Sequence, residues 1–387
     1  MLYSDLYKIS EDLNTLAFAI AKSVDDSSHT LKISDLRTKT KILLELIKRN
    51  ENKIKALEDL ILPTESLEQT KYLAGSKISA VNKGFEVLKK IDDYNFDITN
   101  FGFISLGGGD GTELYTEIEN SCANFGLLLE YDFKSVNKFV QNYVPFKLKN
   151  FHRYNELAID VIECDLFDVN KLNTAKELIQ SKMLDGIVIT IHAVLHELST
   201  RSQLKSKFLN DEGELLLEEF FRELYEWHEN IIIVLREPGE PENWPKVVYI
   251  NIKEEFKKDF LNILEDLDNY HFHGTKDPNF RYRKDQNHIR CKSDLAVEAL
   301  TKLFYKEDYA YEKREKVTSI SRAKISSALQ AGENLYKIIF SEPFFTNSVQ
   351  ANMSKFGVKV TGEASTPQSI PQCFTYTIAT KGLIKQK

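Results

Sequence analysis

A glycine-rich segment in the first half of the chain carries residue types that bind nucleotides through the backbone. It reads Ile104-Ser-Leu-Gly-Gly-Gly-Asp-Gly-Thr-Glu-Leu114 and begins within a short apolar run. Glycines have no Cβ atom, so the backbone can turn sharply and approach a ligand closely. Gly107, Gly109 and Gly111 give the spacing GxGxG, whereas a nicotinamide-dinucleotide fingerprint needs GxGxxG, with its third glycine at Thr112. The spacing indicates a nucleotide loop of another kind, and a tight turn without a ligand is the alternative.

Carboxylates follow the next two apolar runs. Glu130 and Asp132 end the run GLLLEYD, and Glu130 lies 23 residues after Gly107 (130 − 107). Asp165 follows the run AIDVIE. An ionised carboxylate only accepts hydrogen bonds, which suits ligand hydroxyl and amino groups at the end of a strand. The alternatives are exposed carboxylates that solvate the sheet edge and, for Asp165, a helix N-cap.

Two histidines follow a fourth apolar run, in the segment Thr190-Ile-His-Ala-Val-Leu-His-Glu-Leu-Ser199. His192 and His196 are four residues apart, and Glu197 is adjacent to His196. A neutral imidazole, with a pKa of about 6.5, can take a proton from a hydroxyl or an amine. The metalloprotease spelling HExxH is absent and no third ligand is evident, so we expect no metal site.

The runs that precede these residues define the expected fold. They are FGFISL, GLLLEYD, AIDVIECD, DGIVITIHA and NIIIVLRE, and amphipathic segments separate them. Continuous apolar strands that alternate with helices predict a parallel sheet covered on both faces. We therefore expect an α/β fold with a doubly wound, mostly parallel sheet. The candidate residues would lie at the carboxyl edge of that sheet, where ligands of such folds bind.

The run ISLGGGDGTEL resembles the nucleotide loop of class I, Rossmann-like S-adenosylmethionine-dependent methyltransferases. Its GGGDG spelling is also similar to that of spermidine-synthase-type aminopropyltransferases, which share the fold. The resemblance covers about a third of the chain and implies S-adenosylmethionine as the cofactor. Many methyltransferases carry an acid two residues before the first glycine, where this chain has Ser105.

The resemblance also implies roles for individual residues. Glu130 would bind the ribose hydroxyls, with Asp132 as a weaker candidate, and Asp165 would bind the adenine amino group, with Leu166 or Phe167 against the ring. The further cofactor-binding residues that it implies are Gly107, Gly108, Gly109, Asp110, Gly111, Thr190 and His192.

The piece LHELS resembles the LHDWS-type segment of small-molecule O-methyltransferases, in which the histidine is the general base. This implies a catalytic His196 with Glu197 as its orienting neighbour, and a polar residue that merely lines the pocket is the alternative. Arg236-Glu237-Pro238-Gly239 is similar to the segment that closes the fifth strand in the family, or is a surface turn. The expected reaction is methyl transfer to oxygen or nitrogen of a small or medium-sized acceptor.

Two other functions stay open. An aminopropyltransferase would use the same pocket, but the paired acids of that family are missing from DGIVITIHAVLHEL. A non-catalytic binding module with this fold would be expected to lose the cofactor acids, yet Glu130 and Asp165 are present.

Changes of pattern along the chain suggest four regions. Residues 1–95 read as a helical N-terminal region and 96–240 as the cofactor-binding core. Residues 241–345 read as a mostly helical insertion or substrate cap, with helices near 293–306 and 319–340. Residues 346–387 read as a C-terminal β-hairpin that completes the core sheet. The N-terminal helices are expected to cap the core, and a homodimer seam is the alternative.

A basic, aromatic stretch within the insertion could grip an anionic acceptor or an RNA backbone. A solvated surface is slightly preferred over either, and nucleic acid is not the favoured partner. The residues of this stretch are Arg281, Tyr282, Arg283, Lys284, His288, Arg290 and Lys292.

Length and composition exclude several classes of protein. A chain of 387 residues with 42% hydrophobic and 28% charged residues is typical of a globular protein of two or three domains. No apolar run approaches the ~20 residues that span a bilayer, and early acidic residues argue against a secretory signal. The net charge of −7 argues against a surface that binds nucleic acid throughout. Four scattered cysteines favour a reducing, cytoplasmic setting.

Missing motifs narrow the activity further. The chain has no Walker loop, no GxSxG elbow, no Asn/Asp-Pro-Pro-Tyr after the fourth strand and no Pro-Cys nucleophile loop. The sequence therefore gives no support for an enzyme that methylates amino groups of DNA or of glutamine, or for a cytosine-C5 methyltransferase.

Overall fold

Five parallel strands form most of the larger sheet of the protein, as the apolar runs predict. They are β1 (Phe101–Leu106), β2 (Phe125–Glu130), β3 (Ala158–Glu163), β4 (Gly186–His192) and β5 (Ile231–Pro238). Every residue of β1 and β2 is buried. Such strands are apolar throughout because helices cover both faces of the sheet.

The computed structural model describes the chain in segments, and the fold and site below concern those segments only. They are residues 67–149, 157–198, 207–210, 215–239, 245–271, 282–284, 288–304, 320–332, 336–344, 347–362 and 374–386.

Two further strands, β9 (Lys337–Phe344) and β11 (Phe374–Lys381), complete this sheet, which has the order β3-β2-β1-β4-β5-β11-β9. β11 pairs antiparallel with both β5 and β9. The expected α/β class, with a doubly wound, mostly parallel, Rossmann-like sheet, is confirmed. The strand order reverses at β1 and β4, and the crevice outside the carboxyl ends of such strands is where ligands bind.

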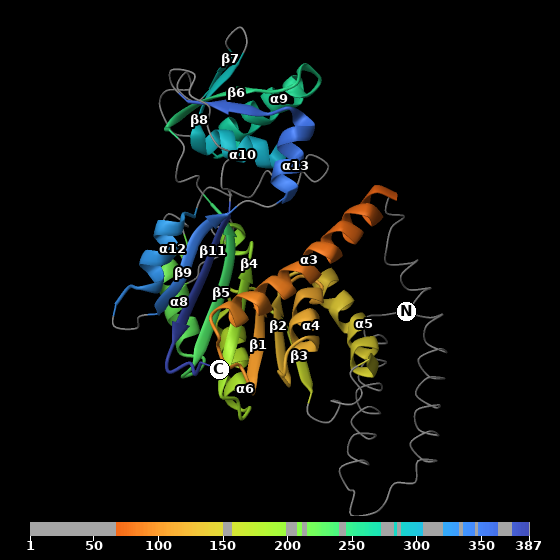
Figure 1. Ribbon diagram of the computed structural model, residues 1–387, viewed down its shortest axis with the longest axis vertical. Coiled ribbons are helices and arrows are strands. Elements are labelled where there is room, and N and C mark those ends of the chain that lie inside the picture. Colours follow the sequence, from red (N-terminus) through yellow and green to blue (C-terminus); the bar gives the residue numbers. More distant parts are fainter. Residues whose placement is uncertain are drawn as a thin grey trace, which may run out of the picture.

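Helices cover the two faces of the seven-stranded sheet (Figure 1). One face carries the core around α6 (Val169–Gln180), α8 (Leu217–Tyr225) and α12 (Arg322–Leu329), including the buried Trp227. The other carries the core around α3 (Leu67–Asp93), α4 (Thr112–Glu119) and α5 (Phe133–Lys149), including the buried Phe139. The short helix α7 (Leu195–Leu198) follows β4 at the carboxyl edge.

A second body of the protein contains a four-stranded antiparallel sheet with the order β10-β6-β8-β7 (Figure 1). Its strands are β6 (Val247–Asn251), β7 (Tyr282–Lys284), β8 (Ile289–Lys292) and β10 (Lys359–Thr361). The helices are α9 (Glu254–His271), α10 (Ser293–Phe304) and α13 (Asn347–Phe356). It has its own hydrophobic core, in which Phe260 and Leu264 of α9 are buried with Leu295 of α10.

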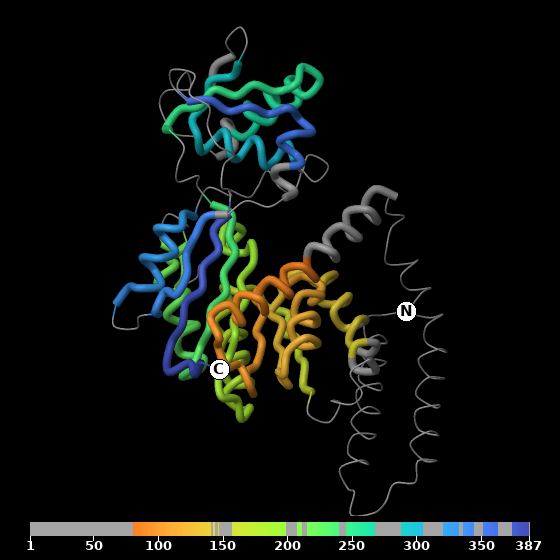
Figure 2. The backbone as a smooth tube through the Cα atoms, viewed as in Figure 1, coloured from red at the N-terminus to blue at the C-terminus, as the bar shows by residue number. Residues whose placement is uncertain are grey.

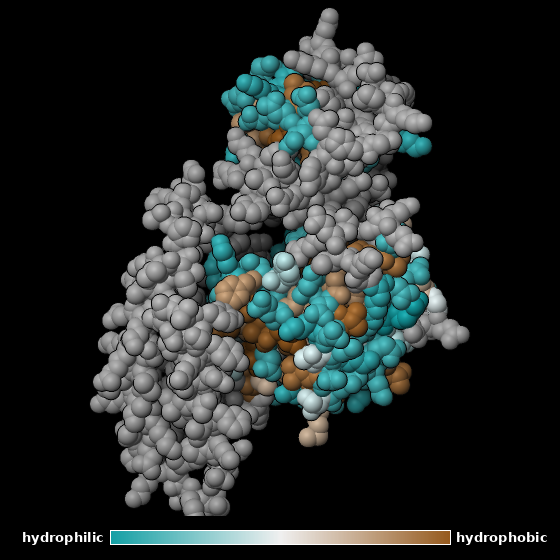
Figure 3. All heavy atoms as spheres, turned by 180° about the vertical axis from the view of Figure 1, so that it is seen from behind, coloured by the Kyte–Doolittle hydropathy of each residue, from teal (hydrophilic) through white to brown (hydrophobic). Residues whose placement is uncertain are grey.

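The second body is built from two insertions that are distant in sequence. One leaves the core after β5 and returns at α12, and the other lies between β9 and β11. Figure 2 shows the two segments side by side, and β10 of the second insertion pairs with β6 of the first. Seen from behind, the described surface of this body is mostly hydrophilic (Figure 3).

These elements differ in three ways from the sequence-based expectation. The helix expected over 319–340 ends as α12 at Leu329, and Lys337–Phe344 is instead strand β9. Of the C-terminal β-hairpin expected over 346–387, only β11 joins the core sheet, because β10 pairs with β6 instead of β11. The insertion expected to be mostly helical also supplies three strands of the second sheet. The partners of β10 and β9 lie far away in sequence, and no local pattern specifies such pairing.

The two insertions leave the core at one place, the carboxyl edge of the parallel strands. In the register of the sheet, Phe374 at the start of β11 lies opposite both Pro238 and Phe344. Phe374 also packs partly against the core of the second body. The second body is therefore attached beside the crevice that holds the candidate site.

The N-terminal region is described only in part. Helix α3 agrees with the expected helical region, but residues 1–66, and with them the stretch expected to form a cap or a dimer seam, lie outside the described residues. Within the described segments, no helix has both the length and the apolar character that crossing a membrane requires.

Candidate functional site

The glycine loop joins β1 to α4 and has a backbone that other residues adopt only under strain. Gly107, Gly109 and Gly111 have φ angles of 65°, 58° and 72°, in the left-handed region. A Cβ atom on Gly107 would lie 2.6 Å from the side chain of Val194, and one on Gly111 would overlap the ring of Phe139. At Gly109 an added Cβ would meet nothing within 4 Å. Two glycines thus allow close packing, whereas Gly109 borders open space.

Glu130, at the end of β2, is fixed against this loop. Its Oε2 accepts a hydrogen bond from the Gly109 N–H at 2.8 Å, and its Oε1 accepts one from the Asp132 N–H at 2.8 Å. Burial raises the pKa of Glu130, and the backbone hydrogen bonds oppose that rise. Each carboxylate oxygen has two lone pairs, so each retains a free acceptor position. The carboxylate can therefore accept further hydrogen bonds from ligand hydroxyls.

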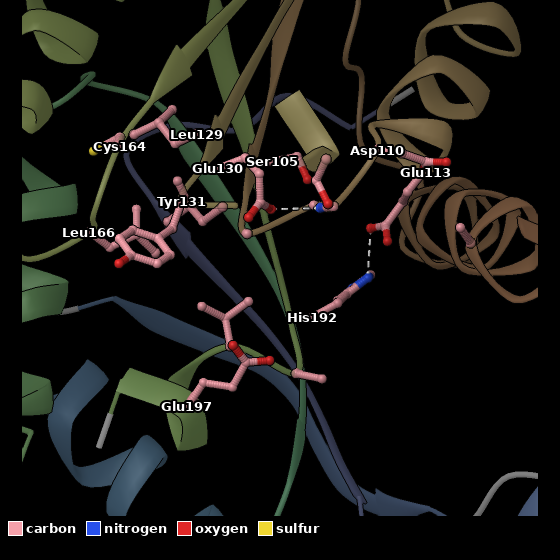
Figure 4. Close-up of a pocket in the computed structure, with 18 of the residues that line it drawn as sticks. Ser105, Asp110, Glu113, Leu129, Glu130, Tyr131, Cys164, Leu166, His192 and Glu197 are labelled. Carbon is pink, nitrogen blue, oxygen red and sulfur yellow. Dashed lines mark hydrogen bonds and ion pairs between the residues drawn. The ribbon is translucent and has the colours of Figure 1, made fainter. Parts of the chain in front are cut away.

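A cavity of about 500 Å³ opens at the loop, within the usual size range of small-molecule sites (Figure 4). It lies at the carboxyl edge of the sheet, between the loop, the ends of β2 and β4, and helix α3. Of the residues predicted from sequence, those that line it are Gly107, Gly108, Gly109, Asp110, Glu130, Leu166, His192 and Glu197. Further lining residues include Ala80, Lys83, Ser105, Glu113, Leu129, Tyr131, Lys138 and Cys164.

A buried histidine–carboxylate pair forms the wall of the cavity on the other side of the loop from Glu130 (Figure 4). Nδ1 of His192, the last residue of β4, lies 2.6 Å from Oε1 of Glu113 in the first turn of α4. Both side chains are 6% exposed. Ala193, which follows, has a φ of 59°. A non-glycine residue in this conformation is strained, and such strain is concentrated at functional sites.

The charge of this wall comes from several buried groups. Burial alone would raise the pKa of Glu113, but the interaction with His192, 2.6 Å away, lowers that pKa overall. Burial lowers the pKa of Lys83, from α3, although the carboxylate of Glu113 partly restores it. At neutral pH Glu113 is therefore an ionised carboxylate that faces the imidazole of His192. No sequence motif identified Lys83 or Glu113, because their contact joins α3, α4 and β4.

Glu117, one turn after Glu113 on α4, is completely buried, and no described residue is a hydrogen-bond partner of its carboxyl oxygens. Burial, and secondarily the charge of Glu113, raise its pKa well above 4.5. The folded protein thus retains a proton that the unfolded chain releases above that pH, so stability falls as pH rises beyond about 4.5.

We expect Glu117→Gln to raise the melting temperature at pH 7–8 by at least about 2 °C, the shift for ~1 kcal/mol in a domain of this size. Glutamine has the same shape and cannot ionise. Thermal unfolding followed by circular dichroism at pH 8 and at pH 4 checks this. Near pH 4 both proteins are neutral at this position, and the difference should nearly vanish. A gain of the same size at both pH values would contradict the assigned cause.

His196, the base implied by resemblance, does not line the cavity. It is 5% exposed, and its Nδ1 lies 2.5 Å from Oε1 of Glu237 in β5. Glu237 is completely buried and accepts further hydrogen bonds from the N–H groups of Val194, Leu195 and His196. The carboxylate beside His196 is therefore Glu237, whereas Glu197 lines the cavity. The segment at 236–239 is not a surface turn, since Glu237 holds the start of α7.

The remaining predicted residues also lie outside the cavity lining. Asp132 is exposed and accepts hydrogen bonds from the N–H and hydroxyl of Ser135 at the start of α5. Asp165 accepts a hydrogen bond from the Phe167 N–H. It is not the helix N-cap that was its alternative, because Asp168 caps α6. Thr190 is 1% exposed, and its hydroxyl lies 3.5 Å from the Ile104 carbonyl of the neighbouring strand.

No group of three histidine, cysteine or acidic side chains is arranged to hold a metal ion in the segments that the structure describes. The residues that converge on the cavity are carboxylates, a lysine, an imidazole and apolar side chains. Such a set can bind a polar ligand that carries hydroxyl groups and positive charge.

Comparisons with known proteins give similarity at the level of structure only. No protein-family model and no curated protein matches the sequence. Among solved structures, an S-adenosylmethionine-dependent methyltransferase from Clostridium acetobutylicum covers 82% of this chain and all of its own, with 9% identity and a TM-score of 0.36.

Two more structures have similar values. An S-adenosylmethionine-dependent methyltransferase from Mesorhizobium loti shares 12% identity, with 76% of this chain and 96% of that chain covered and a TM-score of 0.38. The plantazolicin methyltransferase BamL, in complex with a desmethylPZN analog and SAH, shares 9% identity, with 87% and 97% covered and a TM-score of 0.38. At such values the likeness does not identify a substrate for this chain.

Proposed function

We propose that the protein is an S-adenosylmethionine-dependent methyltransferase that acts on an oxygen or nitrogen of a small or medium-sized acceptor. The observation that carries this proposal is the contact between Glu130 and Gly109 at the edge of the cavity. It joins an acid at the end of β2 to the one loop glycine that borders open space. This is the arrangement expected for a nucleoside whose ribose is held by an acid and whose remaining part runs along the loop.

The residues of the cavity suit S-adenosylmethionine in three respects. The free acceptor positions of Glu130 match the ribose hydroxyls. Leu129 and Leu166 offer apolar contact to an adenine ring. Asp110, Glu113, Glu130 and Glu197 outnumber the two lysines of the lining, which favours a positively charged sulfonium and disfavours a pyrophosphate. When bound, the cofactor would supply an activated methyl group, so the protein has to position the acceptor and accept its proton.

His192 is the residue that we propose as the proton acceptor. Its Nδ1 faces the carboxylate of Glu113, which orients the ring and stabilises the imidazolium, and its Nε2 remains for the acceptor proton. His196, paired with Glu237 in the same way, stays the candidate implied by resemblance. The geometry favours His192, because it lines the cavity and His196 does not.

Titration calorimetry tests the cofactor directly. We expect S-adenosylmethionine and S-adenosylhomocysteine to bind and NAD not to bind. Glu130→Ala should weaken the sulfur ligands by about 1–3 kcal/mol, because ribose hydroxyls lose a charged acceptor. Asp132→Ala is the matched control, since its carboxylate caps α5 outside the cavity, and it should change affinity little. Binding of NAD alone, or equal losses in both variants, would contradict the proposal, and tight binding of only the decarboxylated cofactor would indicate aminopropyl transfer.

A further inference from the structure

The sheet of the second body has one face packed on helices and one face without a described helix. In β8, Ile289 and Cys291 are buried, whereas Arg290 and Lys292 between them are partly exposed. In β6, Val248 and Ile250 are likewise buried and alternate with partly exposed neighbours. The buried set packs against α9 and α10. Because side chains alternate across a strand, the other set shares the opposite, open face.

The register of the strands places the polar members of this open face together. Tyr249 of β6 lies opposite Arg290 of β8, and Val247 lies opposite Lys292. On the other side of β6, Thr361 of β10 lies opposite Tyr249, and Lys359 lies opposite Asn251. Directly opposed residues of an antiparallel pair lie on the same face, about 5 Å apart. Tyr249 is therefore central to the face, with basic residues on the strands to either side.

Charge and aromatic character set this face apart from the rest of the protein. The charged residues on this face are Arg290, Lys292 and Lys359, and the four strands contain no acidic residue. Tyr249 is joined by the ring of His288, at a centroid distance of 5.0 Å and an interplanar angle of 80°. A protein with a net charge of −7 thus gathers positive charge around two aromatic rings on one sheet.

Along the chain, this body contains β6, α9, β7, β8 and α10, and β10 follows after the chain has passed through the core again. Two helices therefore back a four-stranded sheet. Sheets of this kind can bind single-stranded nucleic acid, because bases stack on aromatic residues of the open face while basic side chains contact the phosphates. We propose that the open face around Tyr249, His288, Arg290 and Lys292 is a binding site for single-stranded nucleic acid.

This site is separate from the methyltransferase cavity and does not depend on the function proposed for it. Figure 1 shows α10 on the side of the small sheet that is nearer to the core, so the open face is turned away from the parallel strands. A small anionic acceptor would need cations that converge in a cavity. This face instead spreads its cations over β8 and β10, on either side of Tyr249, which matches the repeat of phosphate and base along a nucleic-acid strand.

Fluorescence anisotropy with the full chain tests the proposal, using labelled RNA and DNA oligonucleotides of about 12 nucleotides and the corresponding duplexes. We expect saturable binding of single strands, weaker binding of duplexes, and loss of affinity as salt rises. Comparison of the affinities for single-stranded RNA and single-stranded DNA shows which of the two nucleic acids the site prefers. Tyr249→Ala should weaken binding roughly 5- to 150-fold, the effect of losing one stacked base, while Tyr249→Phe should retain it.

Arg290→Ala with Lys292→Ala should lower affinity and reduce the slope of log K against log salt by about 1.4, since each lost phosphate contact removes about 0.7. Lys257→Ala with Lys258→Ala removes the same charge from α9, on the other side of the sheet, and should change neither quantity. An unchanged affinity for S-adenosylmethionine shows that the variants are folded. If the protein does not bind S-adenosylmethionine, an unchanged melting temperature shows the same.

Three results would overturn the inference. The first is no binding of single strands at about 100 μM protein in low salt, the weak end of non-specific affinities. The second is equal weakening by the α9 control pair, which would indicate attraction by overall charge. The third is undiminished binding by Tyr249→Ala together with equal affinity for heparin, which would show a site for polyanions without base stacking.

Discussion

Replacing Gly109 by leucine should abolish S-adenosylmethionine binding, with a loss of at least about 100-fold in affinity. An added Cβ at this position meets no protein atom within 4 Å, so the leucine side chain would extend into the space that the ligand needs. The substitution also brings strain of roughly 1–2 kcal/mol, because φ at this residue is 58°. Calorimetry measures the affinity, and thermal unfolding measures the strain.

Gly332 provides a matched control for that strain. It has a φ of 75°, and an added Cβ there also meets nothing within 4 Å, but it lies in the turn between α12 and β9 and does not line the cavity. Gly332→Leu should therefore lower the melting temperature about as much as Gly109→Leu and leave cofactor affinity unchanged. If Gly109→Leu binds the cofactor normally, the space beside the loop is not the nucleoside site.

Replacing His192 by glutamine should lower the rate of methyl transfer by ~10²–10⁴-fold, the usual contribution of a general base. Glutamine can still donate a hydrogen bond to Glu113, so the buried carboxylate keeps a partner and the fold is preserved. The affinity for S-adenosylmethionine should change little. Transfer of labelled methyl groups from S-adenosylmethionine to fractions of small molecules, RNA and protein provides the assay before the acceptor is known.

His196→Gln is the matched comparison, because His196 also pairs with a buried carboxylate, four residues further along the chain. We expect it to retain most activity and to act mainly on stability, since Glu237 and His196 hold α7 in place. The opposite ranking of the two variants would show that the base is the histidine implied by the LHELS segment. Equal losses of turnover and of cofactor affinity would make both residues structural.

The sequence by itself determined the core of the fold and one end of the site. Five apolar runs of strand length between amphipathic segments specify a parallel sheet, since only strands buried on both faces are apolar throughout. The positions of the glycine loop and Glu130 follow from the same pattern, because both lie where a parallel strand ends. The structure places the two in contact, through the hydrogen bond from the Gly109 N–H to Glu130. The loop and Glu130 follow two successive parallel strands, so the order of strands and helices along the chain already implies that they are close in space.

Only the tertiary structure decided which polar side chains meet beyond that point. Glu113 reaches His192 from α4, Lys83 of α3 lines the same cavity, and Glu237 reaches His196 from another strand. A carboxylate has the same local sequence pattern whether it is solvated or buried. The sequence therefore could not show which carboxylates pair with the two histidines.

The same reason accounts for the second body. Strands β6 and β10 belong to insertions separated by core elements, and their pairing depends on where both insertions leave the sheet. In the sequence, His288, Arg290 and Lys292 belong to the basic, aromatic stretch, whereas Tyr249 lies in a separate apolar segment. Their common face exists only because antiparallel register brings these strands together, and a register shift of one residue would turn every one of those side chains to the other side.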